Sequence, residues 1–178
     1  MVKGDIILIS PSHFDHCSSK TVSKKESKIV DRDGNFKIRD IKIRGFPSYH
    51  DEIDGKKRGG NIIFKFELSN IKFCHLGDLG HSLEERAVKQ IQPVDILFIP
   101  VGGVFTLEPQ YCWKVIQDLD PRLVIPMHYK TGGLSISIHK LDEFLKWSPE
   151  ISTTKVGNEI DFDDDDIPPV RTIWEFSL

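Results

Sequence analysis

The chain has 178 residues, of which 39% are hydrophobic and 29% are charged, and its formal net charge is -3. A chain of this length buries roughly 70% of its unfolded surface in one core, so we expect a single domain over residues 1–178. No apolar stretch approaches the ~20 residues of a membrane span, and the start is unlike a signal peptide. We therefore expect a cytoplasmic protein without a membrane partner. The 24 basic and 27 acidic residues show no basic excess, which argues against nucleic acid as a partner.

Alternating apolar residues and turn signals predict short strands in the first half of the chain. Asp33-Gly34 and Ser69-Asn70 mark turns between them. The basic run from Lys20 to Lys28 is interpreted as a solvated loop. The expected strands are residues 5–10, 27–31, 35–38, 40–47, 61–68 and 71–75.

The second half of the chain alternates helices and strands. Ser82 followed by Glu85 matches a capping box, which predicts a helix over residues 83–91. The later elements are expected as a strand at 94–99, a helix with Tyr111, Val115, Ile116 and Leu119 on one face, a strand at 123–126, and a helix with Ile138, Leu141 and Leu145 on one face. His139 would lie on the surface of this last helix.

The segment Ser10-Pro11-Ser12-His13-Phe14-Asp15-His16 directly follows the apolar run of the first strand. It places two imidazoles and a carboxylate within four residues at the tip of a strand. Imidazole nitrogen and carboxylate oxygen bind ions of the Zn²⁺ class at about 2.0–2.2 Å. The alternative is a polar loop that contains histidines by chance. The recurrence of such residues at later strand ends argues against this alternative. The recurrences are Tyr49-His50-Asp51, Gly77-Asp78-Leu79-Gly80-His81 and Pro126-Met127-His128-Tyr129.

In this order the motifs resemble the metallo-β-lactamase superfamily, and within it the lactonase-like metal-dependent hydrolases related to L-ascorbate-6-phosphate lactonase. The resemblance runs from Asp5 to about Trp147 and includes Arg58-Gly59-Gly60-Asn61 and Pro100-Val101-Gly102-Gly103. It implies an α/β (α+β) fold, the αββα sandwich. In this fold the strands that precede the candidate metal ligands all end at one edge. Because the ligand cluster begins as early as His13, we expect this sandwich to lack the family's N-terminal strands.

The resemblance also implies a set of metal ligands. A first site would use His13 and His50, a second site would use Asp15, His16 and His128, and Asp78 would bridge both. The family signature His-x-His-x-Asp-His places its first histidine at Pro11, which has no side-chain donor atom. The first site is therefore one ligand short, whereas the second is complete.

Residues beside the motifs are candidates for catalysis and substrate binding. Asp15 and His81 are the candidate catalytic residues; protonation of a leaving group and a hydrogen bond that orients Asp78 explain His81 equally well. Arg58 is a candidate to bind an anionic substrate group. Tyr129 is a candidate substrate contact, although packing explains it equally well.

These features predict a metal-dependent hydrolase that acts on a small-molecule substrate. An anionic substrate is compatible with them. The ion would activate a water against an ester, lactone or phosphoester bond. Zn²⁺ is the first choice, and Mn²⁺ or Fe²⁺ is compatible. The alternative is a non-catalytic relative that binds metal or senses a ligand, since Pro11 degrades the first site. The apolar strand at 5–10, with no strand before it, also predicts a homo-oligomer.

Overall fold

The computed structural model describes residues 3–10, 19–147, 150–161 and 163–177. The strands are β1 (Gly4–Leu8), β2 (Ser23–Val30), β3 (Gly34–Ile38), β4 (Ile41–Tyr49), β5 (Gly60–Leu68), β6 (Ile71–His75), β7 (Ile96–Pro100), β8 (Leu123–Met127), β9 (Ser152–Val156) and β10 (Thr172–Phe176). The helices are α1 (Ser19–Val22), α2 (Glu85–Ile91), α3 (Pro109–Leu119) and α4 (Leu141–Leu145), with a short 3₁₀ helix η1 at Asp164–Asp166. No helix within these ranges is long and apolar enough to cross a membrane.

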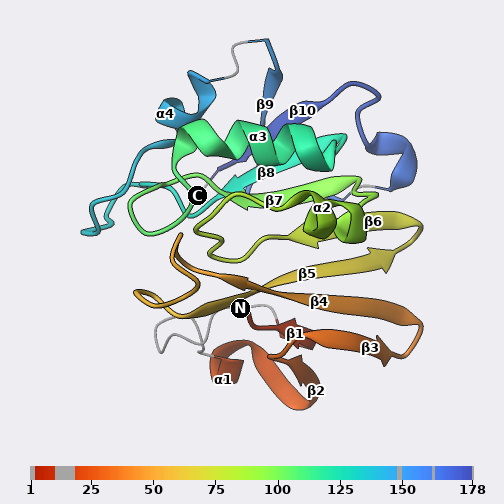
Figure 1. Cartoon of the computed structure of the whole chain (residues 1–178). Coiled ribbons are helices and arrows are strands. Elements are labelled where there is room, and N and C mark those ends of the chain that lie inside the picture. Colours follow the sequence, from red (N-terminus) through yellow and green to blue (C-terminus); the bar gives the residue numbers. More distant parts are fainter. Residues whose placement is uncertain (1–2, 11–18, 148–149, 162, 178) are drawn as a thin grey trace.

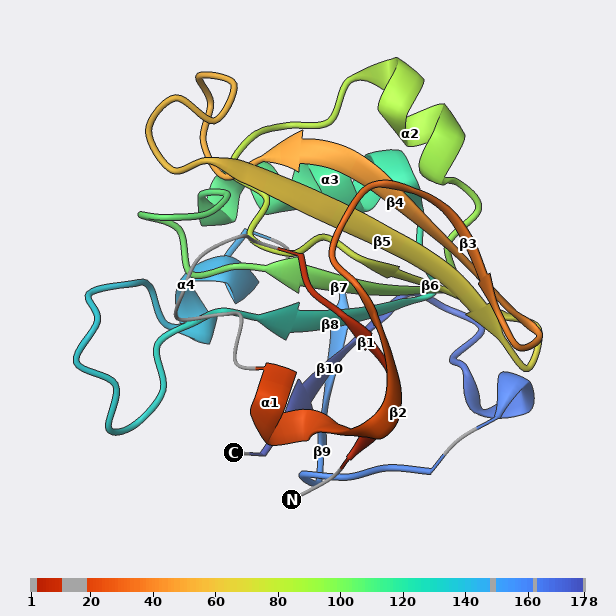
Figure 2. The same ribbon diagram turned by 90° about the horizontal axis from the view of Figure 1, so that it is seen from below.

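Eight strands form one sheet in the order β3-β4-β5-β6-β7-β8-β10-β9, and β1 and β2 form a separate parallel pair. Strands β4, β5 and β6 are antiparallel neighbours, whereas β6, β7 and β8 are parallel neighbours. Strands β4, β6, β7 and β8 therefore run in the same direction, and their carboxyl ends lie at one edge of the sheet. The loops that follow them project from that edge (Figures 1 and 2).

Different elements cover the two faces of the large sheet. Helices α2, α3 and α4 lie on one face, and the β1–β2 pair lies on the other (Figure 2). Successive side chains of a strand point to opposite faces, so Ile63 of β5 joins the core under the helices and Phe64 joins the core under β1–β2. The predicted fold class, a mixed α/β arrangement of the metallo-β-lactamase type, is confirmed. In the described part of the chain, the second sheet has two strands.

Helix α3 shows how the helical layer is fixed. Pro109 begins it where the missing N–H costs no hydrogen bond, and Asp120 ends it in the left-handed region with φ 51°. Trp113 stacks on Phe144 of α4 with ring centroids 4.9 Å apart, and its Nε1 donates to the Phe144 carbonyl (3.2 Å). Full burial of Phe144 contributes about 1.5–3 kcal/mol, which docks α4 on α3.

Two local predictions at helix ends are wrong. Helix α2 begins at Glu85, and Glu84 precedes it without a side-chain capping bond, so Ser82 does not form the predicted capping box. His139 lies before α4 rather than within a helix. Its backbone N–H donates to Gly102 and its carbonyl accepts from Lys130, which holds it against neighbouring loops instead.

The prediction of a loop from Lys20 to Lys28 is also wrong. This run forms part of α1 and most of β2. Its residues pair in parallel with β1, so a long-range contact overrides the lack of an alternating apolar pattern. The lysines themselves are exposed, as a solvated face requires.

Candidate metal centre

Polar residues gather at the edge where the parallel strands end. His50 follows β4, Asp78 follows β6 and His128 follows β8. Ser10 reaches the same edge, because its carbonyl accepts a hydrogen bond (3.0 Å) from Ile62 near the start of β5. Outside the described residues lie Pro11 and three of the predicted ligands, His13, Asp15 and His16.

A buried amide, Asn61 of β5, holds the turn that carries Asp78. Its Oδ1 accepts from the Asp78 backbone N–H (2.9 Å), and its Nδ2 donates to the Leu76 carbonyl (2.8 Å) and to Ser48 Oγ (2.7 Å). Leu76 and Leu79 are fully buried on either side of Asp78. The turn is thus fixed by hydrogen bonds to Asn61 and by two apolar anchors.

Two glycines allow the loops of this edge to pack backbone against backbone. A Cβ on Gly80 would lie 2.4 Å from the carbonyl carbon of His50, and a Cβ on Gly102 would lie 2.1 Å from the carbonyl oxygen of His128. Gly80 also donates its N–H to the Tyr49 carbonyl (3.0 Å). Only glycine permits these approaches, so it sets the positions of two candidate ligands relative to neighbouring loops.

His50 and Asp78 form a buried pair. His50 Nε2 and Asp78 Oδ2 lie 3.4 Å apart, and the side chains are 8% and 9% exposed. Burial lowers the pKa of His50, but the hydrogen bond and charge of Asp78, together with nearby backbone groups, outweigh it and leave that pKa raised. Two donors bound at about 2.1 Å to one tetrahedral ion lie about 3.4 Å apart. The pair therefore fits two ligands of a shared ion, in donor type as well as in spacing.

His128 occupies an uncommon backbone conformation. Directly after β8 it adopts φ 52°, in the left-handed region that costs about 1–2 kcal/mol for a residue other than glycine. Such strained positions gather at functional sites. Within the described ranges, no three His, Cys, Asp or Glu side chains form a group that would hold a metal. The structure thus brings His50 and Asp78 together, and the complete ligand set stays a prediction.

Asp51 organises the loop between β4 and β5. Its Oδ1 accepts from the backbone N–H groups of Ile53 and Gly55 (both 2.9 Å), and its Oδ2 accepts from those of Lys57 (2.9 Å) and Arg58 (2.7 Å). Burial acts to raise the pKa of Asp51, but these four hydrogen bonds lower it to about 2. The carboxylate is therefore charged at neutral pH and fixes the backbone at Arg58.

Arg58 connects this loop to the loop after β7. Its Nη2 donates to the Val104 carbonyl (2.8 Å), and its guanidinium lies 5.4 Å from the centroid of the Phe105 ring. The Val104 N–H donates in turn to Glu108 Oε1 (2.8 Å), and Glu108 Oε2 lies 3.5 Å from His139 Nε2. Arg58, which was predicted to bind a substrate anion, thus makes a hydrogen bond and a ring contact within the protein, and its role toward a substrate stays a prediction.

His81 and Tyr129 both contact other parts of the protein, and the polar contacts of His81 in the described ranges are to backbone groups rather than to Asp78. His81 Nδ1 lies 2.8 Å from the Ser82 carbonyl, and its Nε2 accepts from the Tyr49 backbone N–H (3.3 Å). Tyr129 packs against the core under the helices, where burial and then the charge of Glu175 raise its pKa. Their catalytic and substrate-binding roles stay predictions.

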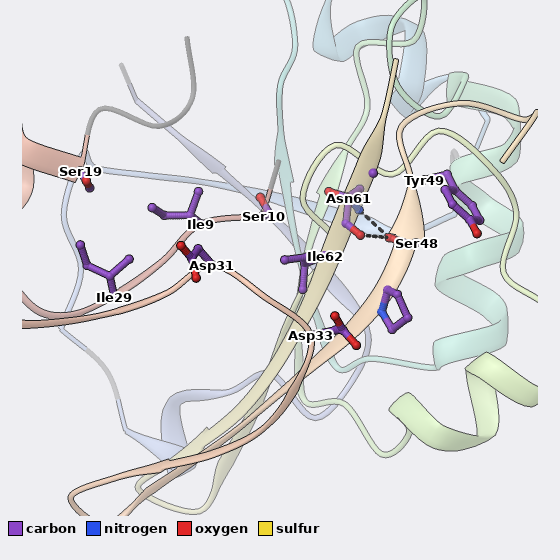
Figure 3. Close-up of a pocket in the computed structure, with 12 residues that line it drawn as sticks. Ile9, Ser10, Ser19, Ile29, Asp31, Asp33, Ser48, Tyr49, Asn61 and Ile62 are labelled. Carbon is purple, nitrogen blue, oxygen red and sulfur yellow. Dashed lines mark hydrogen bonds between the residues drawn. The ribbon is translucent and has the colours of Figure 1, made fainter. Parts of the chain in front are cut away.

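A cavity of about 640 Å³ opens beside Asn61, between the β1–β2 pair and strands β4 and β5 (Figure 3). Ser48 and Asn61 form a hydrogen-bonded polar wall, and Ile62, Asp31 and Asp33 also line the cavity (Figure 3). Its volume falls in the range of small-molecule pockets. The cavity gives a ligand room beside the amide that holds Asp78.

The roles of Asn61 and Asp51 were not predicted from the sequence. Both belong to motifs named above, and the sequence around each residue indicates a structural role. Asn61 stands among apolar residues at the start of a predicted strand, where a buried amide must find partners. Asp51 precedes a segment rich in Gly and Lys, where an aspartate side chain commonly bonds backbone N–H groups of a turn.

Comparisons with known proteins agree with this fold. The sequence profile of the beta-lactamase superfamily domain matches residues 1–128. A structure from Thermotoga maritima, assigned as a zinc-dependent hydrolase of the metallo-β-lactamase superfamily, is 34% identical with a TM-score of 0.82, over 98% of this chain and 82% of that one. A metal-dependent hydrolase of Thermococcus onnurineus is 29% identical over 154 residues, which cover 73% of this chain and 69% of the relative. A protein from Parabacteroides distasonis, at 19% identity and a TM-score of 0.65 over 83% and 72% of the two chains, shares the fold.

The large sheet, its helical layer and the polar edge define a protein of the metallo-β-lactamase fold. The chain belongs to the beta-lactamase superfamily, so the resemblance of its motifs to that superfamily is confirmed. The names of the relatives from Thermotoga and Thermococcus agree with the expectation of an enzyme.

Proposed function

We propose that this protein is a metal-dependent hydrolase that cleaves an ester, lactone or phosphoester bond in a small-molecule substrate. The observation that carries the proposal is the buried His50–Asp78 pair, whose 3.4 Å spacing suits two donors of one ion. The hydrolase names of the Thermotoga maritima and Thermococcus onnurineus relatives support the same class. The lactonase-like branch rests on the motifs alone.

The proposed ligands are those that the motifs predict: His13, Asp15, His16, His50, Asp78 and His128. When bound, a divalent ion supplies a Lewis acid and lowers the pKa of a water. Zn²⁺ is favoured because imidazole and carboxylate donors suit it and the Thermotoga relative is assigned to zinc, while Mn²⁺ and Fe²⁺ accept the same donors. The chain itself positions the turn that carries Asp78, through Asn61, and shields the His50–Asp78 pair from solvent.

The further roles are proposals of the same kind. Asp15 and His81 are proposed as catalytic residues, and Arg58 and Tyr129 as substrate contacts. The cavity beside Asn61 supports a small-molecule partner. A cytoplasmic location is supported by Cys74 and Cys112, which are free and buried.

The test combines metal content with a hydrolysis panel. Purified protein is loaded with Zn²⁺, dialysed and assayed by elemental analysis, then offered lactones, carboxylate esters and phosphodiesters. We expect bound metal and hydrolysis of one bond class, and loss of both in Asp78→Ala. The matched control is Asp118→Ala, because this carboxylate pairs with Lys114 on the surface of α3 and should affect neither. Metal-loaded protein that cleaves no member of the panel would contradict the proposal and favour a non-catalytic relative.

A further inference from the structure

We infer that Val104 forms an apolar subsite for the non-reacting part of the substrate, which therefore carries an aliphatic or aromatic group close to the cleaved bond. The inference rests on the proposed function. Val104 lies in the loop after β7, and its side chain is 41% exposed. An apolar side chain left in water at the edge of a site is available for a ligand.

The backbone of Val104 is strained and clamped. It adopts φ 61°, a genuine outlier for a β-branched residue. Arg58 Nη2 holds its carbonyl and Glu108 Oε1 holds its N–H, both at 2.8 Å. A strained conformation persists only where its surroundings enforce it, and such positions gather at ligand clamps and active sites. Because the side chain is exposed, this strain does not serve the packing of the core.

The loop of Val104 reaches the candidate metal centre at its ends. Before Val104, Gly102 lies against the backbone of His128. After it, Leu107 donates its N–H to the carbonyl of Leu79 (2.8 Å), the residue next to Asp78. Val104 is therefore held between the loops of two candidate ligands.

The same loop also buries the hydroxyl of Thr106. Thr106 is 6% exposed, and its Oγ1 has no hydrogen-bond partner in the described part of the chain. A buried polar atom of this kind is usually satisfied by water or by a ligand. The loop thus offers an exposed apolar contact and a buried polar one only two residues apart.

Neighbouring loops extend the apolar character of this edge. The loop after β4 exposes Ile53 (50%), and the loop after β8 exposes Leu134 (45%) and Ile136 (39%). These two loops and the Val104 loop after β7 project from the same end of the sheet (Figures 1 and 2). The ammonium of Lys130 bonds the carbonyls of Leu134 and Ile136, which fixes the shape of the last loop. Aliphatic side chains on three loops around one edge favour a substrate with apolar surface.

The experiment uses linear carboxylates from propanoate to octanoate as probes. Their head group can bind the metal of Zn²⁺-loaded protein, and their tails sample the subsite. Affinity in the wild type and in each variant is measured by isothermal titration calorimetry, and contact in the wild type is followed through the methyl NMR signals of Val104. Full burial of one methylene corresponds to ~0.8 kcal/mol, or about 4-fold in affinity, and contact with one exposed side chain should give about 2-fold per methylene. The Val104 signals should shift with each longer tail.

Two variants separate this contact from a structural role. Val104→Asn and Val104→Gly remove the methyl groups and place residues that tolerate a positive φ, so both should melt no lower than the wild type. We expect both to lose at least half of the chain-length dependence. The control is Leu68→Asn, since this side chain is comparably exposed (48%) at the opposite end of β5 and should leave the dependence intact.

The outcomes distinguish this inference from the proposed function. A flat chain-length dependence in the wild type, or one that survives both Val104 variants, overturns the subsite even if the hydrolysis panel is positive. A negative hydrolysis panel with a dependence that Val104→Asn abolishes contradicts the proposed reaction and supports the apolar subsite.

Discussion

The side-chain carbonyl of Asn61 accepts a hydrogen bond from the backbone N–H of Asp78 at 2.9 Å, across 17 positions of sequence. The same amide donates to Leu76 and Ser48, so one side chain joins the start of β5 to the end of β4 and to the turn after β6. The location of a candidate metal ligand therefore depends on a residue that need not touch the metal.

Asn61→Ala should weaken metal binding more than it weakens the fold. Loss of groups that orient ligands typically lowers metal affinity by about 10–100-fold. Buried partners left unsatisfied cost about 1–3 kcal/mol, which leaves a folded protein in most domains. Affinity is measured by competition with a chelator, and unfolding by denaturant titration. Asn158→Ala, at an exposed asparagine, is the control. A folded Asn61→Ala protein with wild-type metal affinity would refute the positioning role.

The close approaches at Gly80 and Gly102 predict a second pair of sensitive variants. A methyl group at either position meets backbone atoms of His50 or His128, which cannot move aside as a flexible side chain would. We expect Gly80→Ala and Gly102→Ala to lose about 1–3 kcal/mol of unfolding free energy and to lower metal affinity. Gly132→Ala, where a Cβ would meet nothing within 4 Å, should do neither. Equal stability of all three variants would show that the loops separate easily.

The sequence predicted best those elements whose pattern is local. Residues 61–68 and 71–75 were expected as a hairpin, and β5 and β6 agree with this within one residue because strict alternation and a turn signal sit side by side. Only the second half of β2 was expected, as a strand at 27–31, because the first half is rich in lysine, carries no such pattern, and joins β1 through a long-range contact. The insertion of β10 between β8 and β9 has no local signal either.

Some residues of the candidate site could likewise be predicted from the sequence, and others could not. Motifs predicted His50, Asp78 and His128 because ligand types at strand ends can be recognised residue by residue. The roles of Asn61 and Asp51 depend on bonds from side chains to a folded backbone, which residue types alone do not specify. The positive φ of Val104 was equally hidden, because a β-branched residue gives no sign of a left-handed conformation.

Pro11 predicts a metal stoichiometry that one substitution should change. If the missing imidazole limits the first site, Pro11→His should raise the metal to protein ratio toward two and increase hydrolysis. Elemental analysis after dialysis measures the ratio. His13→Ala should cost less metal than Asp15→Ala or His128→Ala, which belong to the complete second site. A folded Pro11→His protein that gains neither metal nor activity would show that Pro11 does not limit metal binding at the first site.

The β1–β2 pair predicts self-association. Ile29 of β2 is 47% exposed, and in a two-stranded sheet each strand keeps one edge unpaired within the described ranges. We expect sedimentation at micromolar concentration to show a dimer, and Ile29→Lys to dissociate it. Leu68→Lys, at a similarly exposed residue of the large sheet, should not. A compact wild-type monomer would contradict the prediction.

Asp51 predicts how the stability of the protein depends on acid. Its pKa in the folded chain, about 2, lies below its ordinary value of 3.8. A depressed carboxyl pKa contributes stability that is fully present above about pH 4 and is lost as the pH falls through 2. The melting temperature of Asp51→Asn should therefore lie below that of the wild type from pH 7 to 5, because the amide cannot accept all four backbone bonds.

That gap should narrow below pH 4 as the wild-type carboxylate is protonated. Asp54→Asn is the matched control in the same loop, since this exposed side chain accepts none of the four bonds and tolerates the positive φ (58°) as asparagine. Thermal unfolding followed by circular dichroism from pH 7 to 2 measures both variants. A gap of constant size down to pH 2 would mean that the shape of Asp51 matters and its charge does not. The loop carrying Arg58, and with it the clamp on Val104, would then be insensitive to acid.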